Sequence, residues 1–406
     1  MHKNKISVLA DIVLNHKTGA DEKEQVPVIK VKDENRLEKI SEEYMMEAFT
    51  SFKFPGRKGK YSEFIWDFQC FTGLCHNDEG HLIMNEYSHN GWDDLPDNQH
   101  GNYDFLLGSD IEFRNPHVRE ELMRWGEWYV KETGIDGFRL DALKHIQTGF
   151  FPEWLDHLNT NFNRTFFTIG EYWKNDVGSL LHYIDLTQGK IQLFDVPLHF
   201  NFHEASVKGG DYDLRTIFDN TLVSSKPELA ITFVDNHDTQ PLQSLQSPVD
   251  DWFAPLAYAI ILLREQGIPC VFYPSFYGGS YVDEEKREDE PVRGEIKQVP
   301  NLKKIMQVRK DLAYGTQRDY FESSDIIGWV REGNEERKRS GCAVVICNPE
   351  GREIRMSMGE RFKGRTMKDI TGSIQDPIVL DENGEGLFRV GGGSVSVWVD
   401  EKYSGL

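Results

Sequence analysis

The chain has 406 residues, 39% of them hydrophobic, which is enough to bury the cores of two or three globular units. Its 67 Asp and Glu outnumber 46 Lys and Arg, and the net charge of -21 would repel a polyphosphate backbone, so we expect no nucleic-acid partner. No run of apolar residues approaches the roughly 18 needed to cross a bilayer, so we expect no membrane partner.

Six segments have the pattern of short strands buried on both faces. Each is an apolar run that ends in charged, amide or aromatic side chains. In chain order they are KISVLADIVLNH (5 to 16), GIDGFRLDALKH (134 to 145), TFFTIGEYW (165 to 173), IQLFDVPL (191 to 198), LAITFVDNHD (229 to 238) and GIPCVFYPSFYG (267 to 278).

Four segments have apolar residues at helical spacing and are predicted to be helices: 117–133, 150–162, 252–266 and 301–315. Strand and helix in alternation predict parallel βα units. Polar clusters end many of the strands, and no G-x-G-x-x-G follows any of them, which favours a barrel over a doubly wound sheet. The predicted fold is α/β, a (β/α)8 TIM barrel of which about six strands are present.

Two regions depart from this alternation. Residues 17–104 are too long for a loop and predict an inserted small β-rich subdomain. Residues 318–406 alternate short β runs with Gly and Asp turns and predict a C-terminal antiparallel β-sandwich domain. The incomplete barrel is then formed by residues 1–16 and 105–317.

Carboxylates stand at the ends of three predicted strands. Arg139 and Asp141 are two residues apart, so they share one side of a strand, where the guanidinium would lower the pKa of Asp141. Glu171 and Asp238 end later strands. Carboxylates on one rim repel each other, and environments that separate their pKa values suit a nucleophile and an acid, as in glycoside hydrolysis.

Four motifs carry a family resemblance. "DIVLNH" (11 to 16), "GFRLDALKH" (137 to 145), "GEYW" (170 to 173) and "FVDNHD" (233 to 238) resemble, in order, the motifs of the α-amylase family of glycoside hydrolases. The similarity covers essentially the whole chain and is greatest to the liquefying and cytoplasmic bacterial α-amylases. It implies an endo-acting, retaining α-1,4-glucan hydrolase that acts on starch, glycogen or maltodextrins.

The resemblance also implies roles for individual residues. Asp141 would be the nucleophile, Glu171 the general acid/base and Asp238 the carboxylate that stabilises the transition state. The substrate-binding residues would be Arg139, which keeps Asp141 ionised, His16 and His237 at the cleaved sugar, Lys144 and His145 on the leaving side, and Tyr172 and Trp173.

A calcium ion is implied as well. Asn15, Asp104, Asp110 and the backbone oxygen of His145 match the family's structural calcium site, and oxygen ligands without a thiol suit a hard cation. Asp93 matches a ligand of a further cation site in liquefying enzymes, but Arg114 stands where another carboxylate is expected.

The family barrel has two further βα units before "DIVLNH", so the chain is expected to be N-terminally truncated relative to the family. An open barrel exposes two sheet edges, through which the chain could self-associate. The alternative function is therefore a weakly active or inactive glucan-binding fragment. A metal-dependent phosphohydrolase is disfavoured, because its His and Asp would lie on helices and not after apolar strands.

The five cysteines are an odd number scattered along the chain: Cys70, Cys75, Cys270, Cys342 and Cys347. This argues against a disulfide framework and predicts a reduced, cytoplasmic location. Secretion would require a natural N-terminal extension with a signal peptide. A zinc site at Cys70 and Cys75 is disfavoured because no second close pair follows.

Overall fold

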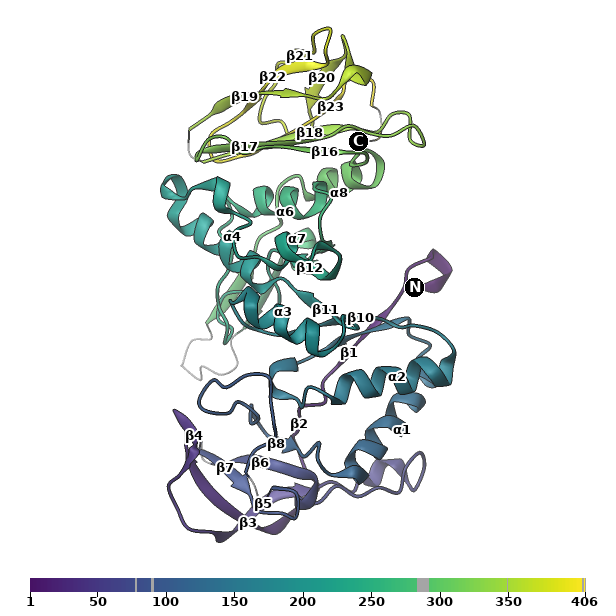
Figure 1. Cartoon of the computed structure of the whole chain (residues 1–406), viewed down its shortest axis with the longest axis vertical. Helices are drawn as coiled ribbons and strands as arrows, with labels where there is room; N and C mark the ends of the chain where they lie inside the picture. The colour runs from purple at the N-terminus through teal and green to yellow at the C-terminus, as the bar shows by residue number, and fades with distance from the viewer. Residues whose placement is uncertain (77–78, 89–90, 283–291, 349, 404, 406) are drawn as a thin grey trace. The chain divides into compact units, whose positions relative to one another are not determined.

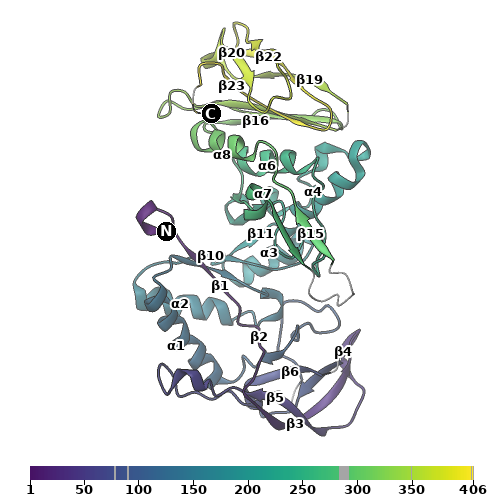
Figure 2. The ribbon, with the colours of Figure 1, turned by 180° about the vertical axis from the view of Figure 1, so that it is seen from behind.

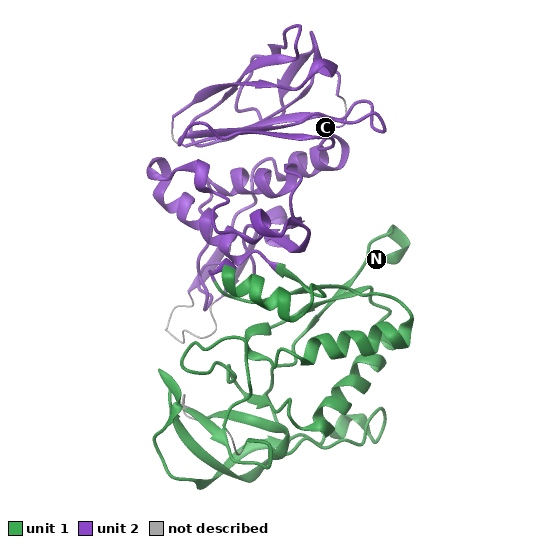
Figure 3. Ribbon diagram, in the orientation of Figure 1, with its two compact units in different colours: residues 1–174, 178–193 green, residues 175–177, 194–406 purple. Residues whose placement is uncertain are grey.

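The computed structural model describes residues 1–406 except 77–78, 89–90, 283–291, 349, 404 and 406. Figure 3 colours two compact units, Met1–Lys174 with Gly178–Leu193, and Asn175–Val177 with Phe194–Leu406. No helix in the described part of the chain is long and apolar enough to span a membrane.

Six strands form one sheet in the order β1-β9-β10-β11-β12-β13, which confirms the predicted half-barrel (Figure 1). The strands are β1 (Leu9–Ile12), β9 (Gly137–Leu140), β10 (Phe167–Gly170), β11 (Gln192–Phe194), β12 (Ala230–Phe233) and β13 (Ile268–Cys270). Strand β9 pairs in parallel with both β1 and β10, and Arg139 stands in register with Asp11 and Ile169. Each strand is shorter than its predicted segment because the polar end leaves the ladder as a loop.

The helices are α1 (Pro116–Thr133), α2 (Phe150–Phe162), α3 (Val177–Leu186), α4 (Val196–Lys208), α5 (Leu222–Ser225), α6 (Ala254–Leu263), α7 (Tyr273–Tyr277) and α8 (Leu302–Asp311). All four predicted helices are present. Asn115 caps the start of α1 by accepting a hydrogen bond from the His117 N–H, and Gly134 ends it with φ 64°. Helix α6 ends at Leu263, three residues early, because the backbone of Arg264 is extended.

The insert is built on a β-sheet in the first unit, seen from both sides in Figures 1 and 2. Its order is β2-β8-β6-β7-β3-β4, with β5 also paired to β3. The strands are β2 (His16–Lys17), β3 (Glu22–Lys32), β4 (Asn35–Lys39), β5 (Tyr44–Ser51), β6 (Phe71–His76), β7 (Glu79–Ile83) and β8 (Ser109–Ile111). Because β2 follows β1 after three residues and sets His16 opposite Asp110, the insert is anchored at the end of the first barrel strand.

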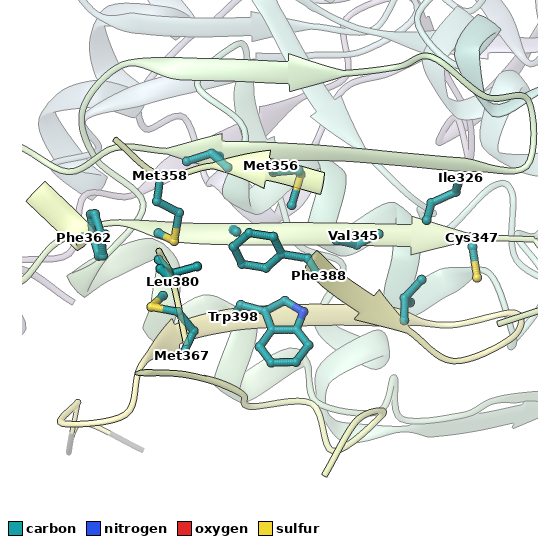
Figure 4. Close-up of a cluster of buried hydrophobic side chains, with 13 residues drawn as sticks. Ile326, Val345, Cys347, Met356, Met358, Phe362, Met367, Leu380, Phe388 and Trp398 are labelled. Atoms are coloured by element: carbon teal, nitrogen blue, oxygen red, sulfur yellow. The ribbon is translucent and has the colours of Figure 1, made fainter. Parts of the chain in front are cut away.

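The C-terminal residues form an antiparallel domain, as predicted. A sheet of order β16-β17-β18-β23-β20-β21 faces the pair β19-β22. Figure 4 shows the buried cluster of this domain, in which Phe388 and Trp398 meet edge to face. The strands are β16 (Gln317–Tyr320), β17 (Ile326–Arg331), β18 (Cys342–Cys347), β19 (Arg352–Ser357), β20 (Thr366–Asp369), β21 (Ile378–Val379), β22 (Glu385–Val390) and β23 (Val395–Asp400). A hairpin that the sequence did not predict, β14 (Gly279–Val282) with β15 (Arg293–Ile296), precedes this domain.

Candidate active site

Two of the predicted catalytic carboxylates follow neighbouring strands of the first unit. Asp141 is the first residue after β9, and its N–H donates to the carbonyl of Ile12 at 3.0 Å. Glu171 is the first residue after β10, and its N–H donates to the carbonyl of Leu140 at 2.9 Å. The parallel hydrogen-bond ladder therefore continues one residue past each strand and fixes the backbone positions of Asp141 and Glu171.

One guanidinium holds both carboxylates. Nη1 of Arg139 donates to Asp141 and, at 2.8 Å, to Asp11, while Nη2 donates to Glu171. The Arg139 side chain is 13% exposed. Burial opposes its charge, but Glu171, Asp141 and Asp11 outweigh burial and raise the pKa of Arg139 above its usual value. Sequence reasoning missed Asp11, whose role depends on the β1–β9 register.

His16, Lys144 and His145 lie around this pair in the same unit. Burial lowers the pKa of His16, and the charge of Asp141 acts in the opposite direction. Lys144 and His145 lie on a 3-10 turn, Leu143–His145, which follows Ala142 at φ 54°. The Nδ1–H of His145 donates to the Tyr103 carbonyl at 2.6 Å, and burial lowers the pKa of His145 to about 3, so its ring is neutral.

Tyr172 and Trp173 follow Glu171 directly, and the two side chains differ in exposure. Tyr172 is 1% exposed, and its hydroxyl donates to Asp97 Oδ2 at 3.3 Å. Trp173 is half-buried. Asp97, which lies in the insert, was not predicted, because a single Asp in a polar loop carries no pattern. A sugar contact by either aromatic ring stays a prediction.

Asp238 and His237 belong to the second unit, in the loop after β12. The Asn236 side chain accepts hydrogen bonds from the N–H groups of Asp238 and Thr239, both at 2.9 Å, which shapes the loop. His237 is exposed, and its Nε2 lies 3.3 Å from Asp238 Oδ2. Asp235 accepts from the Val249 N–H at 3.1 Å, and burial raises its pKa to about 7, which fits a structural carboxyl.

The predicted calcium ligands are buried together in the first unit. Asn15 Nδ2 donates to Asp110 Oδ1 at 3.0 Å, while Asn15 Oδ1 and Asp110 Oδ2 are buried with no hydrogen-bond donor. Burial raises the pKa of Asp104 and Asp110 well above the usual value, and neighbouring carboxylates add to it. Buried oxygens without donors fit a hard cation. However, no group of three or more His, Cys, Asp or Glu side chains in the described residues is arranged to hold a metal, so binding is not shown.

Arg114 places a positive charge beside this cluster. Its guanidinium donates to both carboxylate oxygens of Glu112, at 2.7 and 2.6 Å, and to the carbonyls of Gly91 and Trp92 at 3.0 and 3.2 Å. Asp93 Oδ1 accepts from Gln147 at 3.1 Å, and its Oδ2 has no donor. The positive charge of Arg114 argues against a second cation at this point.

Known proteins resemble the chain along almost its full length. The family model "Alpha amylase, catalytic domain" matches residues 1–309. The cytoplasmic α-amylase of Escherichia coli (strain K12) is 44% identical over 408 residues, covering 99% of this chain and 82% of that protein. An α-amylase of Geobacillus stearothermophilus is 44% identical over 409 residues, covering 99% and 72%.

Solved structures agree on the fold. CldA, a cyclomaltodextrin glucanotransferase, superposes with a TM-score of 0.60 at 20% identity, over 98% of this chain and 76% of that one. An Anoxybacillus α-amylase gives a TM-score of 0.55 at 20% identity, over 73% and 66%. The family model spans more than half of the residues and the relatives share 44% identity over nearly the whole sequence, so the chain belongs to the α-amylase family of glycoside hydrolases.

Proposed function

We propose that the chain is an endo-acting, retaining α-1,4-glucan hydrolase for starch, glycogen or maltodextrins. The observation that carries the proposal is the Arg139 guanidinium, which binds the proposed nucleophile Asp141 and the proposed acid Glu171 at once. Two carboxylates on one guanidinium must be near neighbours, and a retaining mechanism requires a separation of about 5–5.5 Å.

The chemistry would proceed in two balanced steps. An Asp141 oxygen attacks the anomeric carbon as Glu171 transfers its proton to the departing glycosidic oxygen, which gives a glycosyl ester and a free sugar end. Glu171 then takes a proton from water, whose oxygen displaces Asp141 with a second inversion. In this scheme Glu171 must exchange Arg139 for the leaving oxygen, because an acid paired to a guanidinium has no proton to give.

The remaining residues would bind and orient the sugar. Asp238 stabilises the developing positive charge and does not move the proton, and His237 and His16 donate to the hydroxyls of the cleaved sugar. Lys144, His145, Tyr172 and Trp173 complete the substrate contacts, with Lys144 and His145 on the leaving side.

A bound calcium ion would have a structural role, because its positive charge would offset the negative charge of the buried carboxylates of the insert. Asn15, Asp104, Asp110 and the His145 carbonyl would hold it. The unpartnered oxygens of Asn15 and Asp110 support this part of the proposal.

Organisation and location follow from the same reasoning. We divide the chain into an incomplete catalytic barrel (1–16 and 105–317), a calcium-binding subdomain (17–104) and a C-terminal sandwich (318–406). The location would be the cytoplasm, like that of the Escherichia coli relative. Self-association through the edges β1 and β13 would be detected as a dimer by sedimentation.

The test is the release of reducing ends from a maltoheptaoside blocked at its non-reducing end, which only an endo-acting enzyme can cut. With calcium present we expect turnover by the wild type and a loss of at least about 1,000-fold in Glu171→Gln. Glu204→Gln, at an exposed residue paired with Lys208, is the matched control.

The stereochemistry is tested separately. The anomer of the first product, read by NMR, should be α. Equal rates in wild type and Glu171→Gln would refute the assignment, and binding without turnover would favour the glucan-binding fragment.

A further inference from the structure

A carboxylate of the insert is buried against the segment that carries the proposed acid. The Asp97 side chain has no exposed surface. Its Oδ1 accepts from the Gln99 N–H at 2.9 Å, and its Oδ2 accepts from Lys174 Nζ at 2.8 Å and the Tyr172 hydroxyl at 3.3 Å. A buried charge destabilises the fold unless it is paired and hydrogen-bonded, so these contacts hold Asp97 in place.

The partners of Asp97 follow Glu171 in the chain by one and three residues. The Tyr172 ring is buried and packs 5.1 Å from the Tyr183 ring. Lys174 is held by Asp97, and its side chain keeps 34% of its surface exposed. The Asp97 contacts therefore fix both the path of the loop after Glu171 and the position of one ammonium group.

Lys144 adds a second ammonium to the same neighbourhood. Burial lowers its pKa, Asp97 and Glu171 act in the opposite direction, and Lys174 lowers it further by repulsion. Lys144 therefore lies within electrostatic range of the Asp97–Lys174 pair and of Glu171. Asp97 attracts both ammonium groups: Lys174 contacts it directly, and the charges of Lys174 and Lys144 both help to lower the pKa of Asp97.

We propose that Asp97 is a positioning residue which, by holding Lys174 and Tyr172, arranges Lys174 beside Lys144 as a hydrogen-bond donor to the sugar on the leaving side of the cleaved bond. This inference rests on the proposed function, because the leaving side is defined by Glu171 and Lys144. An ammonium group that is held by Asp97 and belongs to a partly exposed side chain can donate to the neutral hydroxyls of a glucose unit.

The test compares two substrates with different groups on the leaving side of the cleaved bond. Cleavage of an aryl maltotrioside releases a phenol, so no sugar occupies the leaving side, whereas the blocked maltoheptaoside places sugars there. Removal of a charged hydrogen bond corresponds to a loss of roughly 10-fold or more. For Asp97→Asn and Lys174→Met we expect kcat/KM to fall about 10-fold on the maltoheptaoside and less than about twofold on the aryl substrate. Lys174→Arg should restore part of the loss.

The controls separate positioning from a general structural role. Lys190→Met removes a half-buried lysine paired with Asp156 and should leave kcat/KM unchanged on both substrates. An equal loss on both substrates, or no loss on either, would overturn the proposal. If Asp97→Asn does not fold, Lys174→Met, which keeps Asp97, tests the proposal by itself.

Failure of the proposed function gives a different result. If the wild type cleaves neither substrate, the hydrolase assignment fails, and the Asp97 proposal is then tested by calorimetric binding of maltotetraose. We expect about 10-fold weaker affinity in Lys174→Met than in Lys190→Met, and equal affinities would overturn the proposal.

Discussion

At the scale of single residues, Asp195 should make the stability of the second unit depend on pH. It is fully buried and accepts hydrogen bonds from the N–H groups of Leu198, Leu222 and Val223 at 3.1, 3.0 and 2.7 Å. Burial outweighs these bonds and raises its pKa to about 6, against about 3.9 in an unfolded chain. Between these values the folded state binds a proton that the unfolded state has released, so unfolding becomes easier as the pH rises from about 4 to 6.

The measurement is the melting temperature of wild type and Asp195→Asn at pH 4.5, 5.5 and 7. The difference, wild type minus variant, should be largest at pH 4.5 and smallest at pH 7. Asp213→Asn is the control: the Arg215 hydrogen bond lowers the pKa of Asp213, so its contribution to stability is lost only below about pH 4 and its difference should stay nearly constant over this series. A difference that does not change with pH would contradict the expected titration of Asp195.

The site was predictable only where its residues share a sequence motif. Arg139 and Asp141 stand two apart on one strand, and the structure joins them as expected. Asp11 and Asp97 were missed: the position of Asp11 depends on strand register, and the contact of Asp97 joins it to Lys174, 77 residues further along the chain. A sequence pattern reports local periodicity and does not show which residues far apart in the chain make contact.

At the scale of elements, the α1–α2 contact depends on a glycine. A methyl group on Gly126 would stand 2.8 Å from three ring atoms of the buried Trp154, whose indole N–H also donates to the Leu122 carbonyl at 3.1 Å. Alanine favours a helix by up to about 1 kcal/mol, but overpacking costs about 1–3 kcal/mol. We therefore expect Gly126→Ala to lower the free energy of unfolding by about 1–2 kcal/mol, measured with urea. Gly56→Ala, at an exposed position where a methyl group meets nothing within 4 Å, should change it little, and an unchanged Gly126→Ala would refute the packing argument.

The elements themselves were predictable where apolar periodicity is strong. It predicts all six barrel strands and four of the helices, but not α3, α4, α5 or α7. Helix α4 begins directly after β11, with Asp195 as its N-cap and Pro197 in its first turn, whereas the apolar run predicts "DVPL" as the end of a strand. The boundary is set by the capping hydrogen bond of a buried Asp, and an apolar run alone does not reveal it.

At the scale of the whole molecule, the negative charge is partly buried. Asp93, Asp104 and Asp110 lie inside the first unit, where burial raises the pKa of each. Within the described residues, the salt bridges leave these three without a lysine or arginine partner, since Arg114 pairs with Glu112. An excess of buried carboxylates destabilises a fold unless a cation binds.

Calcium removal should therefore lower the stability of the whole chain. A ligand at 100 times its dissociation constant stabilises the folded state by about 2.7 kcal/mol, so millimolar calcium should raise the melting temperature by several degrees over a chelator. Magnesium should act less, because it demands a stricter geometry. Asp110→Asn removes a charge beside the unpartnered oxygen of Asn15 and should abolish most of the calcium-dependent shift, whereas Asp251→Asn, on an exposed pair with Lys297, should retain it. If chelation leaves the melting temperature of the wild type unchanged, the buried carboxylates are neutral in the folded chain and bind no calcium.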